Sequence, residues 1–119
     1  MEKHELTQIA ADQLNVAKTS SDGLSLQLLV GDEKGAIQQT VVALTEGHGV
    51  GARESTEHTT MQVLSGAVRV RTSEGQEQAV EGELMEMPTD PHVISAQKDS
   101  AVLLTESKTE TGGWNPQAR

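Results

Sequence analysis

Histidine is the residue type in this chain that is best suited to site chemistry. The four histidines, His4, His48, His58 and His92, are its only neutral nitrogen ligands. The absence of cysteine excludes disulfide bonds, thiolate-bound zinc and cysteine nucleophiles. No pair of carboxylates stands out as a general acid and base among the 18 acidic residues. We therefore look for chemistry in a histidine-containing metal site or binding pocket.

Two of the histidines, His4 and His48, lie in positions that are explained without a metal or ligand site. His4 belongs to the terminal segment, where we expect it to be solvated. His48 sits between Gly47 and Gly49, which favours a flexible turn over a role in a pocket. The run Gly47-His-Gly-Val-Gly51 is not a phosphate-binding loop, because it precedes a strand-rich segment and not a helix.

Charge and composition exclude several classes of partner. The net charge of −9, with no cluster of Lys or Arg, opposes binding to nucleic acid. No apolar run approaches the ~20 residues of a membrane span, and the first residues lack the apolar core of a signal peptide, so we expect a cytoplasmic protein. Trp114 is the single aromatic residue, which argues against a site that stacks a nucleotide base or flavin. A solvated face is the expectation for the string of acidic residues Glu74, Glu77, Glu81, Glu83 and Glu86.

The elements that must position a site are one helix and a series of short strands. Helical spacing of apolar residues over 5–18, ended by Ser20 to Gly23, predicts an amphipathic helix. From residue 24 the apolar period is two, with a hairpin turn at 31–35. The glycines at 47, 49 and 51 interrupt this pattern. Strands are predicted at 24–30, 36–45, 59–64, 67–72, 76–80, 83–87, 92–97 and 101–107. This pattern predicts an antiparallel all-β sandwich or barrel.

Two stretches carry a family resemblance. The first is GHGVGARESTEHTTMQVLSG, which runs from Gly47 to Gly66 and ends in a V-L-x-G turn. The second is GELMEMPTDPH, which contains Gly82, Pro88 and His92. They resemble the two motifs of the cupins, and small single-domain bacterial cupins with an N-terminal helix are most similar. The resemblance implies a double-stranded β-helix (jelly-roll) barrel over 24–108, after a helix and linker at 1–23 and before a tail at 109–119.

The resemblance also implies where a metal would bind. Cupins usually hold their metal with three imidazoles and one carboxylate. In strict register, these positions are occupied here by Arg53, Ser55, Thr59 and His92, so only His92 matches. We therefore expect no cofactor in the usual cupin site. The predicted pocket is lined instead by Arg53, Ser55, Met61, Gln62, Met85 and His92.

A shift of the first motif by one residue gives a different ligand set. Glu54 and His58 then join His92 as one carboxylate and two histidines, a combination that suits zinc or ferrous iron. The alternative is that Glu54 and His58 are loop residues facing solvent. Two roles are also open for Arg53. Its guanidinium either holds a carboxylate or phosphate of a ligand, or forms a surface ion pair with a nearby glutamate.

Two functions from different classes follow from these alternatives. The first is a metal-free, cupin-like protein that binds a small molecule of unknown identity. The second is a metal-dependent enzyme of the dioxygenase or isomerase type, built on Glu54, His58 and His92. In both cases we expect a homodimer, because cupins commonly pair through edge strands and the strand at 24–30 is apolar enough to need cover.

Overall fold

The computed structural model describes residues 1–31, 36–53 and 58–107. Within them lie one helix and nine strands. Their order is α1 (Leu6–Thr19), β1 (Leu24–Val30), β2 (Ile37–Leu44), β3 (Gly49–Arg53), β4 (Thr59–Ser65), β5 (Ala67–Thr72), β6 (Gly75–Val80), β7 (Leu84–Glu86), β8 (His92–Ala96) and β9 (Ser100–Ser107). The predicted helix and the alternation of short strands after it are therefore confirmed. The predicted turn residues 32–35 and the tail at 109–119 lie outside the described residues.

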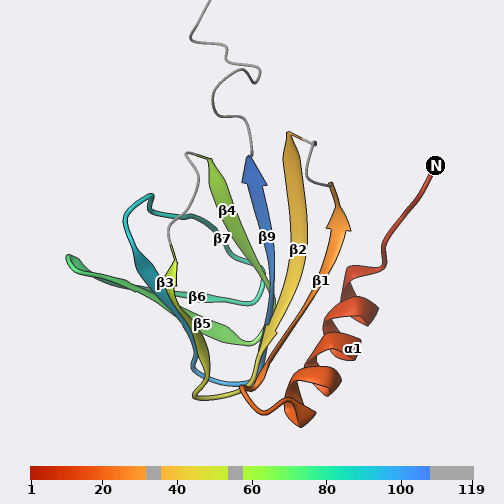
Figure 1. The fold of residues 1–119 in the computed structure, drawn as a ribbon, viewed down its shortest axis with the longest axis horizontal. Coiled ribbons are helices and arrows are strands. Elements are labelled where there is room, and N and C mark those ends of the chain that lie inside the picture. The colour runs from red at the N-terminus through yellow and green to blue at the C-terminus, as the bar shows by residue number, and fades with distance from the viewer. Residues whose placement is uncertain (32–35, 54–57, 108–119) are drawn as a thin grey trace, which may run out of the picture.

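The described strands form two antiparallel sheets. One has five strands in the order β1-β2-β9-β4-β7, and the other has four in the order β3-β8-β5-β6. Figure 1 shows the two sheets facing each other and converging at the lower end of the view. This layout is consistent with the predicted jelly roll. Closure into a complete barrel stays a prediction, because the described strands leave both sheets open at their edges.

The core lies between the sheets and is aliphatic. Alternate residues on each strand point inward, as a period of two requires. The largest side chains that are fully buried include Leu44, Met61, Val63, Val68 and Val102. With no Phe or Tyr in the chain, methionine fills volume that an aromatic ring takes in many other β-proteins.

Helix α1 covers the outer face of the five-stranded sheet, as Figure 1 shows. Ala10 and Ala17 are buried on its inner side, where a small side chain lets the helix approach the sheet closely. The Lys18 ammonium lies 3.9 Å from a carboxylate oxygen of Asp99, in the turn between β8 and β9. No helix in the described ranges is long and apolar enough to cross a membrane.

Strand β3 corrects one expectation from the sequence. The glycines at 47, 49 and 51 were expected to interrupt the strand pattern, but Gly49–Arg53 forms a strand that pairs with β8. Glycine has weak intrinsic strand propensity, so tertiary pairing decides this segment. At Gly49 the absence of a side chain is required, since a Cβ atom would come within 3.0 Å of the Cα atom of Ser95.

Candidate functional site

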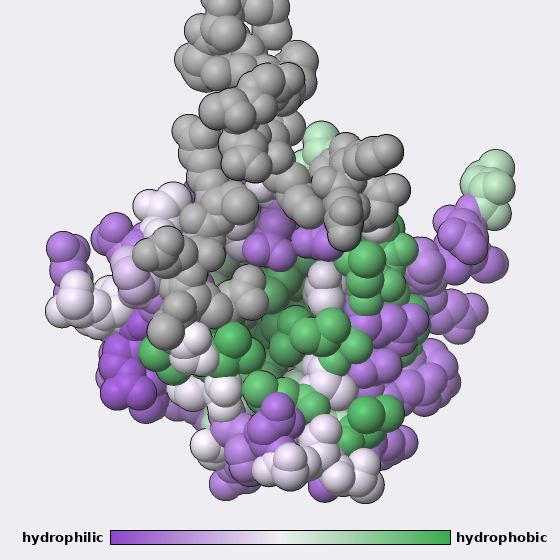
Figure 2. Space-filling model, in the orientation of Figure 1, coloured by the Kyte–Doolittle hydropathy of each residue, from purple (hydrophilic) through white to green (hydrophobic). Residues whose placement is uncertain are grey.

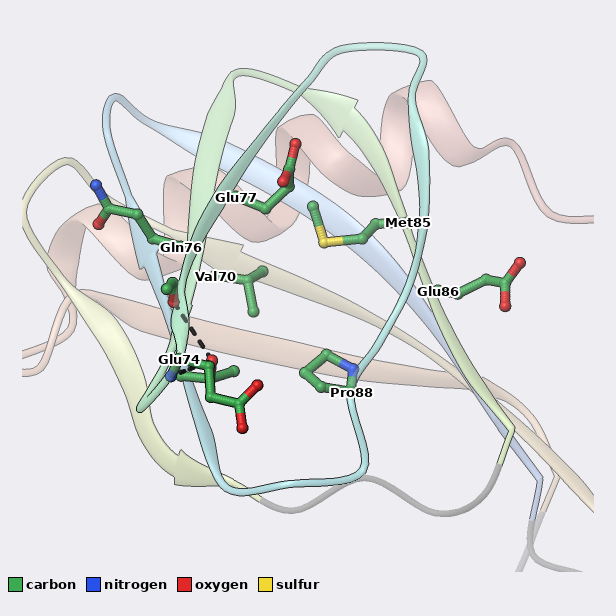
Figure 3. A pocket seen from close by; sticks show the side chains of 9 residues that line it. Val70, Glu74, Gln76, Glu77, Met85, Glu86 and Pro88 are labelled. Atoms are coloured by element: carbon green, nitrogen blue, oxygen red, sulfur yellow. Dashed lines mark hydrogen bonds between the residues drawn. The ribbon is translucent and has the colours of Figure 1, made fainter.

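A cavity of about 370 Å³ lies between the β5–β6 hairpin and the segment that runs from β7 to Pro88. Its apolar lining comes from Val70, Met85 and Pro88. Val70 belongs to the core and Met85 packs against the core, so the floor of the cavity is continuous with the interior of the protein. Figure 3 shows these side chains around a common space. We call this space the β6–β7 cavity, after the two edge strands beside it.

The polar part of the same lining consists of Thr72, Gln76 and three glutamates. Glu77 lies opposite Val70 in the β5–β6 register, so both side chains are on the same side of the hairpin, but Val70 is buried and Glu77 is exposed. In Figure 3 the Glu77 and Met85 side chains are directed into the same space. Glu74 lies in the turn before β6, where its backbone N–H donates to Thr72 Oγ1 over 3.1 Å. Glu86 is at the outer side, with its carboxylate pointing away from Val70.

The structure brings two of the predicted pocket residues together. Met61 and Met85 are register partners on β4 and β7. Met61 is fully buried in the core, whereas Met85 is half-buried and lines the β6–β7 cavity. Gln62 follows Met61, so the alternation of the strand places it on the opposite face, where its side chain is exposed.

His92 and Arg53 meet at the end of the four-stranded sheet. They are register partners at the start of β8 and the end of β3. His92 is only 2% exposed, and its Nδ1 lies 2.9 Å from the carbonyl oxygen of Asp90. A carbonyl oxygen can only accept, so Nδ1 of His92 carries a proton and donates it to this bond. His92 is not part of the lining of the β6–β7 cavity.

The residues at the cupin ligand positions do not fit the usual metal set. A guanidinium has no lone pair to offer a metal, which removes Arg53. Thr59 is buried on β4, where the family places a carboxylate. The described residues contain no group of three or more His, Asp or Glu side chains that could hold a metal ion.

The alternative ligand set cannot be assembled from the described residues alone. His58, the residue before β4, is exposed, while His92 is buried. Glu54 and Ser55 lie outside the described residues. Glu54, His58 and His92 therefore stay a prediction as a metal site.

The expected solvated face agrees with the structure, in which the acidic residues Glu74, Glu77, Glu81, Glu83 and Glu86 are all exposed. The sequence did not indicate that Glu74, Glu77 and Glu86 also border the β6–β7 cavity. Alternation along β6 gave no clear inward face, because Ala79 and Val80 are both apolar although Ala79 is buried and Val80 exposed. The pairing of Glu77 with Val70 across the hairpin was the signal that could have placed it.

Comparison with known proteins supports the fold. No protein-family model matches the sequence, and a search of curated proteins finds no relative. Among solved structures, a conserved protein of unknown function from Streptococcus pyogenes is 25% identical, with a TM-score of 0.67 over 77% of this chain and 80% of that one. A cupin superfamily protein from Desulfitobacterium hafniense is 15% identical, with a TM-score of 0.64 over 71% and 76%.

A larger enzyme contains a similar unit. A salicylate 1,2-dioxygenase mutant from Pseudoaminobacter salicylatoxidans is 19% identical, with a TM-score of 0.70. The match covers 89% of this chain but only 34% of the dioxygenase. At this identity the likeness concerns the fold and not the reaction.

Proposed function

Because the chain has the fold of small cupin-superfamily proteins, we propose that it is a small-molecule-binding protein whose ligand occupies the β6–β7 cavity. The observation that carries this proposal is a cavity of about 370 Å³ with an apolar floor and a polar rim. Ligand pockets in proteins span roughly 300–1,000 Å³ and combine apolar walls with a few polar groups. In this proposal binding needs no metal.

The test uses cyclohexanol, a neutral probe, and ligand-observed NMR. Met85→Trp places a bulky ring at the floor of the cavity and is expected to abolish the binding signal. Leu84→Trp is the matched control, because Leu84 is the neighbouring residue on β7 and is 64% exposed on the opposite face. Circular dichroism of both variants checks that they fold. If a folded Met85→Trp protein bound the probe as well as the unmodified protein, the cavity would not be the binding site.

A second candidate function is the metal-dependent enzyme, and the geometry of His92 favours it. Histidines that bind metals commonly donate their other ring N–H to a backbone carbonyl, as His92 does to Asp90. In this reading Glu54, His58 and His92 hold zinc or iron, which would supply Lewis-acid or redox chemistry. The chain's own contribution is to fix the orientation of the His92 ring.

Elemental analysis of untagged protein separates the two functions. The metal-free proposal predicts less than about a tenth of an equivalent of zinc or iron, because structural and catalytic sites normally retain their ion. One equivalent that is lost in both His58→Ala and His92→Ala would instead establish the enzyme's site. Loss in only one of the two variants would contradict that three-residue site.

We further propose a homodimer that pairs through β1. Within the described residues, β1 pairs only with β2, so its other edge is open. Leu26 and Leu28 are 68% and 44% exposed on this strand. Figure 2 shows apolar side chains gathered on the face between the two sheets. Burial of this surface against a second copy would remove both the apolar exposure and the open edge. The cytoplasmic location and the division at residues 23 and 108 stay predictions.

A further inference from the structure

The internal methionines of the chain gather in one place. The chain has four methionines, of which Met1 begins the sequence and is exposed. The other three are Met61 on β4, Met85 on β7 and Met87 directly after β7. Met61 and Met87 are buried in the core, and Met85 packs against it. All three internal methionines therefore belong to one part of the core, which a role as volume filler alone does not require.

The pairing of β4 with β7 puts these side chains on one face. Met61 and Met85 are register partners, and the backbone N–H of Met87 donates to the carbonyl oxygen of Thr59 over 2.9 Å. Since side chains alternate along a strand, Met61, Met85 and Met87 share the inward face. Opposite residues in such a ladder have Cβ atoms about 4.5–5.5 Å apart, and diagonal neighbours about 7–8 Å. Because a methionine side chain is long and has three rotatable bonds, the three sulfurs can meet at one point.

Three neighbouring thioethers form a set of soft ligands. Thioether sulfur selects Cu(I), whereas imidazole suits zinc and iron, and carboxylates suit magnesium, calcium and manganese. The described residues contain no group of three His, Asp or Glu side chains that would favour one of those harder ions. Thioethers carry no charge and cannot neutralise a bound ion, which favours an ion with a single positive charge.

Met85 connects this group of sulfurs with solvent. It is half-buried and lines the β6–β7 cavity, so an ion can reach it without opening the core. Glu77 lines the same cavity, and Figure 3 shows its side chain on the same side of the space as the Met85 sulfur. A carboxylate at this distance from the core lowers the cost of a positive charge at the edge of the apolar interior.

We propose that Met61, Met85 and Met87 bind one monovalent soft metal ion of the Cu(I) class at the floor of the β6–β7 cavity. The site differs in ligands and in metal from the alternative zinc or iron site, which uses carboxylate oxygen and imidazole nitrogen. It goes beyond the proposed function, because it needs no organic ligand in the cavity. The ion keeps its oxidation state, so the proposal concerns binding alone.

Silver(I) is the probe, because it shares the soft chemistry of Cu(I) and does not oxidise in air. Protein labelled with ¹³C at the methionine methyl groups is titrated with silver nitrate in chloride-free buffer and followed by NMR. We expect the signals of the three internal methionines to shift and to saturate at one equivalent, while the signal of Met1 stays unchanged. Silver that binds without shifting the internal methionines would be an adventitious ion only and would overturn the proposal.

Leucine variants remove the sulfur while keeping the apolar volume, a type of exchange that cores tolerate well. Met61→Leu with Met85→Leu is expected to weaken silver binding by more than about tenfold in isothermal titration, since even the loss of a group behind a metal ligand costs that much. The control, His4→Gln with His48→Gln, removes two exposed imidazoles and should leave the affinity within about twofold. Unchanged affinity in the leucine variant, or an equal loss in the control, would overturn the proposal.

The single variant Met85→Leu separates this ion site from the proposed function. It keeps the floor of the cavity apolar, so cyclohexanol binding should persist while silver binding weakens. If silver binding does not depend on the methionines, the ion site is wrong and the small-molecule proposal stands. If cyclohexanol binding does not depend on Met85 but silver binding does, the reverse holds. Circular dichroism of each variant confirms that the readout comes from folded protein.

Discussion

At the scale of single residues, the first-motif glycines Gly66 and Gly47 differ in the space around them. Gly66 has a φ of 89°, and a Cβ there would overlap the Ser100 hydroxyl and the backbone carbonyl of Asp99. Ser100 is itself fully buried and accepts a hydrogen bond from the Ala67 N–H over 3.0 Å, so it cannot move aside cheaply. Gly47 has a similar φ of 85° but open space around it. The glycine that ends the first motif is thus required by packing.

We predict that Gly66→Ala destabilises the protein more than Gly47→Ala. A left-handed backbone costs a non-glycine residue roughly 1–2 kcal/mol at both sites, and the overlap at Gly66 adds about 1–3 kcal/mol. Urea unfolding of the two variants measures the difference. Equal losses would mean that the Ser100 turn can shift to make room.

Met61 is the second residue whose role can be tested directly. It is fully buried between the sheets, while its neighbour Gln62 is exposed. Met61→Ala is expected to cost about 2–5 kcal/mol in the free energy of unfolding, because it leaves a void in a tightly packed core. The control Gln62→Ala should stay within about 0.5 kcal/mol. A small loss in Met61→Ala would show that the core collapses around the missing side chain.

At the scale of elements, helix α1 works as a cover for the five-stranded sheet. The outward-facing side chains Val41, Ala43 and Leu103 are buried although they point away from the core between the sheets. Ala17, fully buried on the helix, belongs to the layer that covers this outer face. An element that looks like an appendage in sequence is therefore part of the folded unit.

Replacement of Ala17 by a charged residue tests this role. Ala17→Glu places an unpaired carboxylate in the layer between helix and sheet, and we expect a loss of about 3 kcal/mol or more. Ala11→Glu introduces the same side chain at an exposed position of α1 and should change stability by about 0.5 kcal/mol. Thermal melting followed by circular dichroism compares them. Similar melting temperatures would mean that the helix detaches without cost.

At the scale of the whole molecule, the two sheets differ by one strand and both have open edges. Among the described strands, β1 ends the larger sheet, and β3 ends the smaller one. Leu26, Leu28 and Val30 on β1 are exposed apolar side chains. A second copy with the same exposed strand offers a matching surface, as a two-fold interface requires.

The homodimer makes a prediction about Leu26. Leu26→Lys introduces a charge at the centre of the proposed interface and should convert the dimer to a monomer in light scattering at micromolar concentration. Val16→Lys, at a residue that is 50% exposed on α1, is the control and should stay dimeric. An unmodified protein that is already monomeric would overturn the proposal.

The sequence alone predicted the helix, most of the strands and the mainly antiparallel β class. Periodicity placed α1 and most of the strands, because a period of two or 3.6 depends on local alternation of apolar residues. Gly66, Gly82 and Pro88 indicated the family resemblance, and solved structures of similar fold agree with it. The departure of Arg53 and Thr59 from the usual metal ligands could also be read without coordinates.

Only the tertiary structure decided which residues share a cavity. Glu77 and Val70 meet across a hairpin, and Met85 reaches the same space from the other sheet. Strand β3 likewise depends on pairing with β8, more than 40 residues later in the chain for Gly49 and Ser95. Such neighbours are set by register and by sheet packing, and a linear pattern contains neither. The alternation of apolar residues determines the local secondary structure, whereas the β6–β7 cavity exists only after the two sheets have packed together.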